Sequence, residues 1–153
     1  MNLNAALRLL EQQHNAVFSI QILHPAFLES EALRLAPDQY LHHGEFCRTT
    51  KMHGGQMVCV RNKDRSLAVA RLGHPFHGIC PFGVWDYAFP VKPGAELIAV
   101  IYAGSFRIAD QSAPSPQTVA ALHRACSFLN DLILLEIALW QKTAGTGKQR
   151  PPD

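Results

Sequence analysis

The strongest structural signals in this chain lie in residues 74–106, HPFHGICPFGVWDYAFPVKPGAELIAVIYAGSF. Two apolar runs, Val84–Val91 and residues 96–104, flank the tetrapeptide Lys-Pro-Gly-Ala. A short loop that contains Pro and Gly between two β-rich runs is typical of a β-hairpin. We therefore expect two antiparallel strands in this stretch.

The first predicted strand has two unlike faces, because side chains alternate along a strand. Its aromatic face carries Trp85, Tyr87, Phe89 and Val91, and its other face carries Val84, Asp86 and Ala88. An acid in an apolar strand must be paired or hydrogen-bonded, since a bare buried charge is costly. Asp86 is therefore expected either to anchor the preceding loop or to contact a ligand.

The residues before the hairpin predict a loop. Residues 73–83 contain three glycines and two prolines, which interrupt regular structure. We expect His74, His77 and Cys80 to lie on this loop, which leads into the sheet. Binding sites are often built on loops of this kind.

Composition predicts one globular domain. The chain has 153 residues, of which 48% are apolar and 17% charged, enough to fill a core. Residues 1–142 are expected to form the domain, and residues 143–153 a disordered tail. The net charge is +2, with scattered Lys and Arg, so direct nucleic-acid binding is not expected. No signal peptide or membrane-length apolar run is evident, which favours a cytoplasmic protein with reduced cysteines.

Helices are expected on both sides of the hairpin in sequence, which predicts an α+β fold. Apolar periodicity predicts helices over residues 2–14, 62–72 and 117–142, a further helix beginning at Pro37 and ended by the glycines at 54 and 55, and a strand over residues 17–23. The second half of the last helix is apolar around most of its girth, so one face can pack on the sheet while another needs a partner. We expect a homodimer through this helix. The alternative is a helix buried within its own domain.

The cysteines and histidines leave two interpretations open. Cys47, Cys59 and Cys80 are separated by twelve and twenty-one residues, and none belongs to a CxxC pair. With His74 and His77 they could supply a thiol-based metal or redox site. Buried thiols that act as small apolar side chains are the alternative, and no cofactor is expected.

Aromatic residues near glycines predict a small cavity beside the hairpin. Core packing alone explains at least half of them. The predicted ligand-binding residues are Phe46, Cys47, Cys59, Cys80, Gly83, Trp85, Asp86, Tyr87 and Tyr102.

Enzyme motifs are missing from the sequence. There is no nucleophile elbow, phosphate-binding glycine loop or HExxH sequence. A nucleophile built from Cys80 and a nearby histidine, as in a thiol reductase, is the enzymatic alternative.

Several short motifs follow one another in a definite order between residues 45 and 105. They are Phe46-Cys47, Cys59 with Asp64 and Ala68, Gly73-His74-Pro75, Cys80-Pro81-Phe82-Gly83 with Asp86, Pro90-Val91, and Gly104-Ser105. Their order and spacing resemble PocR-type sensory domains, the ligand-sensing modules of bacterial transcription regulators and signalling proteins. The sequence departs from the family at Pro81, where His is frequent, and at Ser105, where Gln is frequent.

The resemblance implies a PAS- or GAF-like fold, with helices on an antiparallel sheet that encloses a pocket for a small, mostly apolar organic molecule. Short diols have been proposed as ligands of the family. We therefore expect a stand-alone sensory module that signals through its dimer helix or a partner protein.

Overall fold

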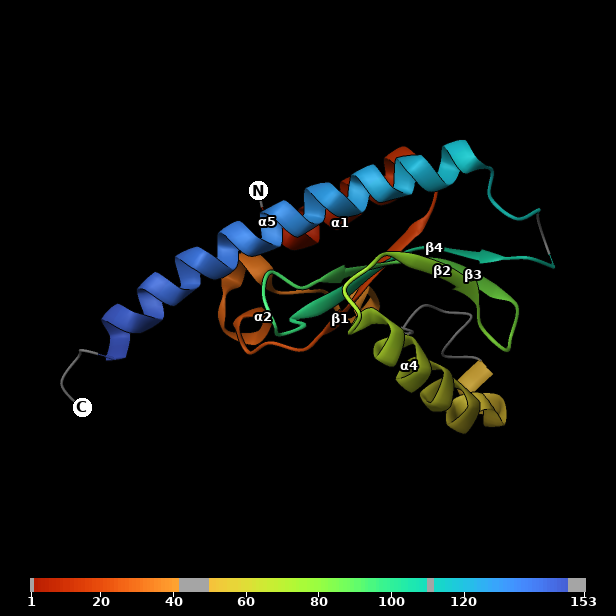
Figure 1. Ribbon diagram of the computed structural model, residues 1–153, viewed down its shortest axis with the longest axis horizontal. Helices are drawn as coiled ribbons and strands as arrows, with labels where there is room; N and C mark the ends of the chain where they lie inside the picture. Colours follow the sequence, from red (N-terminus) through yellow and green to blue (C-terminus); the bar gives the residue numbers. More distant parts are fainter. Residues whose placement is uncertain (1, 42–49, 110–111, 149–153) are drawn as a thin grey trace.

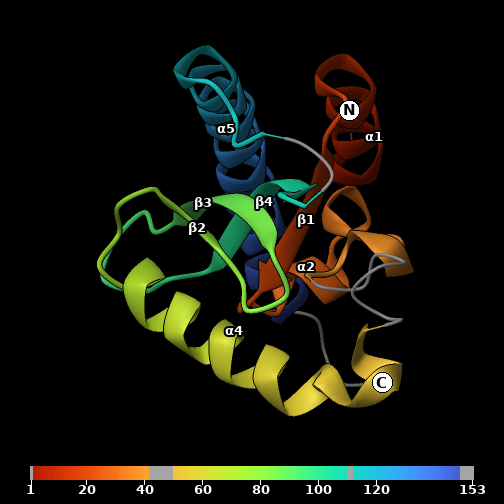
Figure 2. The ribbon, with the colours of Figure 1, turned by 90° about the vertical axis from the view of Figure 1, so that its right-hand side faces the viewer.

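A four-stranded antiparallel sheet lies between two layers of helices (Figure 1; Figure 2). This computed structural model describes residues 2–41, 50–109 and 112–148. Helices α1 and α5 cover one face of the sheet, and α4 lies across the other. The predicted α+β class, with flanking helices and a long C-terminal helix, is confirmed.

The sheet is built around the predicted hairpin. Its strands are β1 (Val17–Ile22), β2 (Phe76–Ile79), β3 (Val84–Val91) and β4 (Ala99–Arg107), in the spatial order β1-β4-β3-β2. The β3 and β4 strands form the hairpin, and β1 pairs with the other edge of β4. The second hairpin strand begins at Ala99, later than the predicted residue 96.

Strand β2 corrects the predicted loop. Residues 76–79 pair with β3 despite the glycine at position 78, so His77 lies on a strand rather than on a loop. The strand forms because it is at the edge of the sheet, where one neighbour supplies its hydrogen bonds. His74 lies before this strand and Cys80 directly after it.

The two helices on the first face begin as the sequence predicts. Helix α1 (Leu3–His14) is capped by Asn2, whose side-chain oxygen accepts a hydrogen bond from the Ala5 amide at 2.8 Å. Helix α5 (Pro116–Lys148) is capped by the Ser115 hydroxyl, which accepts from the Thr118 amide at 3.2 Å. Proline is favourable at the first position of α5, because a backbone N–H at that position has no acceptor within the helix and its absence costs nothing.

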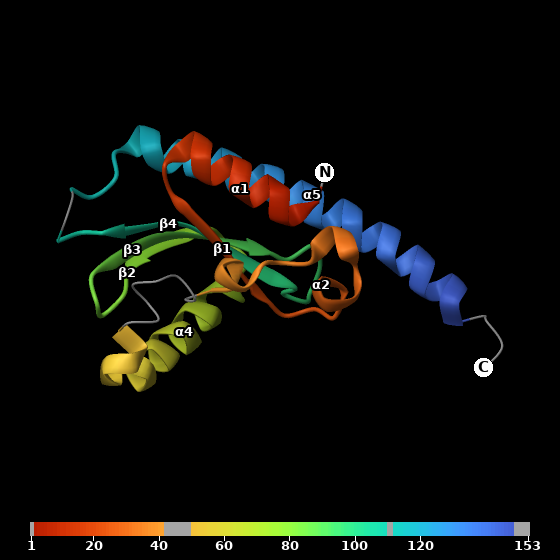
Figure 3. The same ribbon diagram turned by 180° about the vertical axis from the view of Figure 1, so that it is seen from behind.

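Helix α5 is longer than predicted. It has 33 residues and spans about 50 Å, and residues 143–148 belong to it rather than to a tail. Its C-terminal part extends beyond the sheet and the other helices (Figure 1; Figure 3). By length and composition alone, the segment Pro116–Ala144 would suffice to cross a membrane, in contrast to the sequence-based expectation.

Helix α4 (Gln56–Ala70) begins earlier than predicted, after a turn of π-helix at Lys51–Gly55. The backbone is non-helical at His53 and Gly54, where φ of Gly54 is +92°, so the chain kinks directly before α4. Where a helix from Pro37 to the glycines at 54 and 55 was predicted, the described residues form a helical turn at Pro37–Gln39 and the π-helical turn at Lys51–Gly55, and residues 42–49 lie outside the described residues. The chain between β1 and the first turn holds the short helix α2 (Ala26–Glu29) and a turn at Glu31–Leu33. Within α4 only Cys59 and Ala70 are buried, so this helix is held far less tightly than α5.

Each face of the sheet has its own core. The α1 and α5 side holds the larger one, which includes Leu7, Phe18, Trp85, Ile101 and Leu129. The α4 side holds the smaller one, made of Leu41, Ala70, Ala88, Leu97, Val100 and Tyr102. Successive residues of β3 and β4 enter opposite cores, which confirms the predicted faces of the first hairpin strand.

Truncating one leucine of α1 tests this division between core and surface. Leu7 is fully buried, whereas Leu9 is 42% exposed. We predict that Leu7→Ala lowers the free energy of unfolding by about 2–5 kcal/mol, because it leaves a cavity in the core. The matched control Leu9→Ala should cost less than about 1 kcal/mol in the same urea titration. Equal losses would contradict the packing described here.

Candidate ligand pocket

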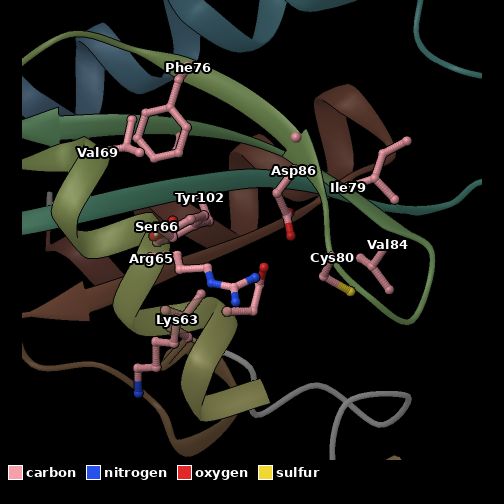
Figure 4. A pocket seen from close by; sticks show the side chains of 14 residues that line it. Lys63, Arg65, Ser66, Val69, Phe76, Ile79, Cys80, Val84, Asp86 and Tyr102 are labelled. Atoms are coloured by element: carbon pink, nitrogen blue, oxygen red, sulfur yellow. Dashed lines mark hydrogen bonds between the residues drawn. The ribbon is translucent and has the colours of Figure 1, made fainter. Parts of the chain in front are cut away.

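A cavity of about 180 Å³ lies between α4 and the sheet (Figure 4). Sites for drug-sized ligands measure roughly 300–1,000 Å³, so only a small molecule fits here. The lining residues are Leu41, Asn62, Lys63, Arg65, Ser66, Val69, Phe76, Gly78, Ile79, Cys80, Val84, Asp86, Ala88 and Tyr102.

Helix periodicity and strand alternation gather this lining. Asn62, Ser66 and Val69 follow one another at spacings of four and three, which places them on one face of α4. Asp86 and Ala88 lie on the face of β3 that looks toward α4. The cavity is therefore walled by apolar side chains near Phe76 and Val69 and carries its polar groups around Asp86 (Figure 4).

Asp86 holds an irregular point of the β3–β4 hairpin. The register shifts at Trp85 and Asp86, so that Ser105 is the extra residue of a β-bulge, with φ +51°. Asp86 Oδ1 accepts hydrogen bonds from the Ser105 amide at 2.8 Å and from the Ser105 hydroxyl at 3.1 Å. The carboxyl thus accepts the hydrogen bond of the Ser105 N–H, which the bulge leaves without a partner on the neighbouring strand.

Gly104 completes the bulge. Its φ is +122°, and a Cβ atom there would lie 3.1 Å from the indole ring of Trp85. Only glycine meets both conditions without strain. The bulge is therefore fixed by a backbone preference at Gly104 and by a side-chain hydrogen bond at Asp86.

Burial changes the acidity of Asp86. Part of the residue is accessible through the cavity, but its carboxyl group is surrounded by protein, and this desolvation raises the pKa to about 7. The hydrogen bonds from Ser105 offset only part of the rise. The carboxyl is therefore poised between its acid and its anion at neutral pH.

Tyr102 faces the cavity from β4. Its hydroxyl lies 2.7 Å from the Ser66 hydroxyl, which ties β4 to α4. Burial raises the pKa of Tyr102 to about 12, so the phenol stays neutral. Cys80 also lines the cavity, and its sulfur accepts a hydrogen bond from the Phe82 amide at 3.4 Å.

The predicted pocket residues divide between three places. Cys80, Asp86 and Tyr102 come together in the cavity, as predicted. Trp85 and Tyr87 do not join them: strand alternation places both in the core on the opposite face. The prediction that they share one pocket with Tyr102 is therefore wrong.

The remaining predicted residues do not line the cavity. Cys59 is buried in α4 but away from the lining, and Gly83 forms the turn before β3 with φ +80°. A side chain at Gly83 would meet no atom within 4 Å, so it would not narrow the pocket. Phe46 and Cys47 lie outside the described residues.

Tyr87 has a different role. Its hydroxyl and the Nδ1 atom of His123 on α5 are 2.7 Å apart and share a hydrogen bond. Because Tyr87 follows Asp86 on β3, adjacent residues of one strand face the cavity and contact α5. Strand β3 therefore contacts the cavity through Asp86 and the long helix through the next residue, Tyr87.

The candidate metal ligands are not gathered into one site. In the described ranges no three His, Cys, Asp or Glu side chains form a group that could hold a metal ion. His77 packs its ring against Trp85, with centroids 5.6 Å apart, on the side of the sheet away from the cavity. Cys47 lies outside those ranges.

A family comparison fits this architecture. The family model described as "Sensory domain found in PocR" matches residues 35–138, which is more than half of the chain. The chain belongs to the PocR sensory domain family. Comparisons with curated proteins and with solved structures gave no match.

The match to the PocR sensory domain covers every element from the turn at Pro37–Gln39 through most of α5. It therefore includes the whole cavity and the helix that contacts Tyr87. The resemblance noted from the short motifs is confirmed, and it extends further toward both ends than residues 45–105.

Four polar residues of the cavity lining, all on α4, were missed in the sequence: Asn62, Lys63, Arg65 and Ser66. Their signal was the polar face of a helix with few apolar residues. Ser105 was noted only as a departure from the family motif. Its hydrogen bonds to Asp86 depend on the β-bulge, which no local sequence pattern predicted.

Replacing Asp86 tests its protonation and its hydrogen bonds. Between pH 3.8, the ordinary pKa of an aspartate, and about 7, the folded state holds a proton that the unfolded chain has lost. Stability must therefore fall as the pH rises through this window. We predict that the free energy of unfolding of the native protein falls over this range relative to that of Asp86→Asn, whose amide carries no charge.

The alanine variant separates the two contributions. At pH 5, Asp86→Ala should cost about 1–3 kcal/mol, because the two Ser105 donors lose their acceptor. Asp86→Asn should cost less, since it keeps an oxygen. Urea unfolding measured from pH 4.5 to 7.5 checks both, and parallel curves for the native protein and the asparagine variant would refute the raised pKa.

Proposed function

We propose that this PocR sensory domain binds a small, mostly apolar organic molecule in the cavity between α4 and the sheet. The observation that carries the proposal is a desolvated carboxyl, Asp86, that lines a cavity with an apolar wall near Val69 and Phe76. The bulge uses Asp86 Oδ1, and a second carboxyl oxygen is available to a ligand in the cavity. The family is one of sensory domains, which favours detection over catalysis.

The shape of the cavity suggests the kind of ligand. Leu41, Val69, Phe76 and Ala88 offer an apolar wall, while Asp86 offers hydrogen bonding at the other end. A molecule with a short hydrocarbon body and one polar end satisfies both. Helix α4 closes the cavity with few buried contacts of its own, so it can adjust to an occupant at little cost.

We propose that occupancy is passed to α5. A ligand that competes for Asp86 weakens its hold on Ser105 and changes the bulge. Tyr87 is next in the strand and is bonded to His123, so a shift of β3 reaches α5 directly. We propose that the bulge adopts a second arrangement when Asp86 releases Ser105, as such coupling requires.

The long helix offers a surface for the signalling step. Phe128, Leu135 and Leu139 are 50%, 58% and 49% exposed and follow one another at spacings of seven and four. They lie on a different face of α5 from the buried residues Leu129, Ile133 and Ile137. This second apolar stripe supports the homodimer predicted from the sequence.

Filling the cavity tests the ligand site. Gly78 on β2 lines the cavity beside Asp86, its cross-strand neighbour on β3. A Cβ atom at Gly78 would meet nothing within 4 Å. We predict that one of a panel of two- to four-carbon alcohols and diols raises the melting temperature of the native protein. A ligand at one hundred times its dissociation constant stabilises by about 2.7 kcal/mol. Gly78→Leu should stay folded and lose the shift.

The control for this experiment is Gly94→Leu. Gly94 lies in the hairpin loop, where an added side chain also meets open space, but it does not line this cavity. The control should keep the full shift. A shift that persists in Gly78→Leu would place the ligand elsewhere.

Charging the second stripe tests the dimer. We predict that the native protein sediments as a dimer and that the Leu135→Glu, Leu139→Glu double variant sediments as a folded monomer, because four carboxylates would face each other across the seam. Gln141→Glu lies on another side of α5 and should leave the dimer intact. A native protein that is monomeric at high micromolar concentration would refute the proposal.

A further inference from the structure

Two groups of opposite charge type share the cavity without meeting. Arg65 reaches from α4 toward the space below Asp86 (Figure 4). Within residues 2–41, 50–109 and 112–148, both described ion pairs involve Arg8, and the guanidinium of Arg65 joins neither. The hydrogen bonds described for the Asp86 carboxyl both come from Ser105.

The chemistry of a guanidinium defines what it will bind. Its planar fork matches a carboxylate, which accepts two parallel hydrogen bonds. A neutral alcohol offers a single acceptor and no charge. The open position between Arg65 and Asp86 therefore suits a planar group that accepts from Arg65 on one side and faces the Asp86 carboxyl on the other.

We infer that the cavity selects a short-chain monocarboxylate, with its carboxylate held between Arg65 and Asp86 and its hydrocarbon tail against Val69, Phe76 and Ala88. This inference rests on the proposed function, since it names the ligand class of the same cavity. The volume of about 180 Å³ suits a chain of about three or four carbons.

Protonation of Asp86 makes this arrangement favourable. The acid form donates a hydrogen bond to the ligand's carboxylate, whereas the anion would repel it. The titratable and charged groups that line the cavity with Asp86 are Lys63 and Arg65 from α4, Tyr102 from β4 and Cys80 from the turn after β2. Because burial raises the pKa of Asp86 to about 7, its acid form is about tenfold more abundant at pH 6 than at pH 8.

Calorimetric titration with propionate and with 1-propanol tests the inference. Propionate should bind the native protein at least tenfold more tightly than 1-propanol, and about tenfold more tightly at pH 6 than at pH 8. Asp86→Asn retains a donor and should bind propionate with little dependence on pH. These two readouts separate hydrogen bonding by the acid from simple attraction to a cation.

Two variants of α4 supply the matched comparison. Arg65→Gln should lose at least tenfold in propionate affinity and leave 1-propanol binding unchanged. Lys63→Gln removes the same charge, but the Lys63 ammonium points away from Asp86 (Figure 4), so it should change propionate affinity less than threefold. Lys63 is half-buried and Arg65 is exposed, and neither belongs to the core, so neither change should unfold the protein.

The outcomes distinguish the two proposals. Binding of 1-propanol without propionate, or propionate binding that Arg65→Gln does not weaken, overturns the carboxylate inference and leaves the sensory cavity standing. Binding of neither compound by the native protein overturns the carboxylate inference. Loss of both in Gly78→Leu, with propionate preferred in the native protein, supports the two proposals together.

Discussion

The hydrogen bonds from Ser105 to the Asp86 carboxyl are the interaction on which the pocket depends. They let β4 carry one residue more than β3 without leaving an amide unsatisfied. The same carboxyl is kept away from bulk water and beside the cavity, which raises its pKa. One side chain is thus a structural anchor, a titratable group and, as proposed, a contact for the ligand.

The two faces of the hairpin explain how a local event can reach the long helix. Residues that alternate along β3 and β4 enter separate cores, one shared with α1 and α5 and the other covered by α4. The first core is large and closed, whereas the second is small and adjoins the cavity. A rigid layer on one side of the sheet and a weakly held helix on the other is a suitable arrangement for a sensor.

Helix α5 links the two proposed activities. One of its faces is part of the larger core and carries His123, the partner of Tyr87. Another carries the exposed stripe of Phe128, Leu135 and Leu139. A change in β3 therefore acts on the same helix that is proposed to hold two copies of the chain together. Ligand binding would then change the geometry of the dimer.

Local signals predicted much of this fold. The hairpin and the long helix follow from turn residues and apolar periodicity, which act within a few residues of sequence. The strand β2 was missed because its pairing with β3 outweighs the weak propensity of its glycine. The start of α4 was missed because its apolar pattern is faint.

The pocket was only partly predictable for a different reason. Cys80, Asp86 and Tyr102 stood out as a thiol, a lone acid and a polar aromatic beside glycines. Trp85 and Tyr87 were also polar aromatics near glycines, although the alternation of β3 already placed them on the other face of the strand from Asp86. Arg65 and Ser66 become pocket residues through the packing of α4 on the sheet, a long-range contact that the local sequence does not encode.

The central claim is that Asp86 is a desolvated carboxyl that holds Ser105 at the edge of a ligand cavity. A titration of its carboxyl carbon by ¹³C NMR measures this directly, with the Ser105 amide resonance followed in the same samples. The account predicts a midpoint near pH 7 for the carboxyl and a change of the Ser105 amide with the same midpoint. A midpoint near the ordinary value of 3.8, or a Ser105 amide that does not respond, would contradict it.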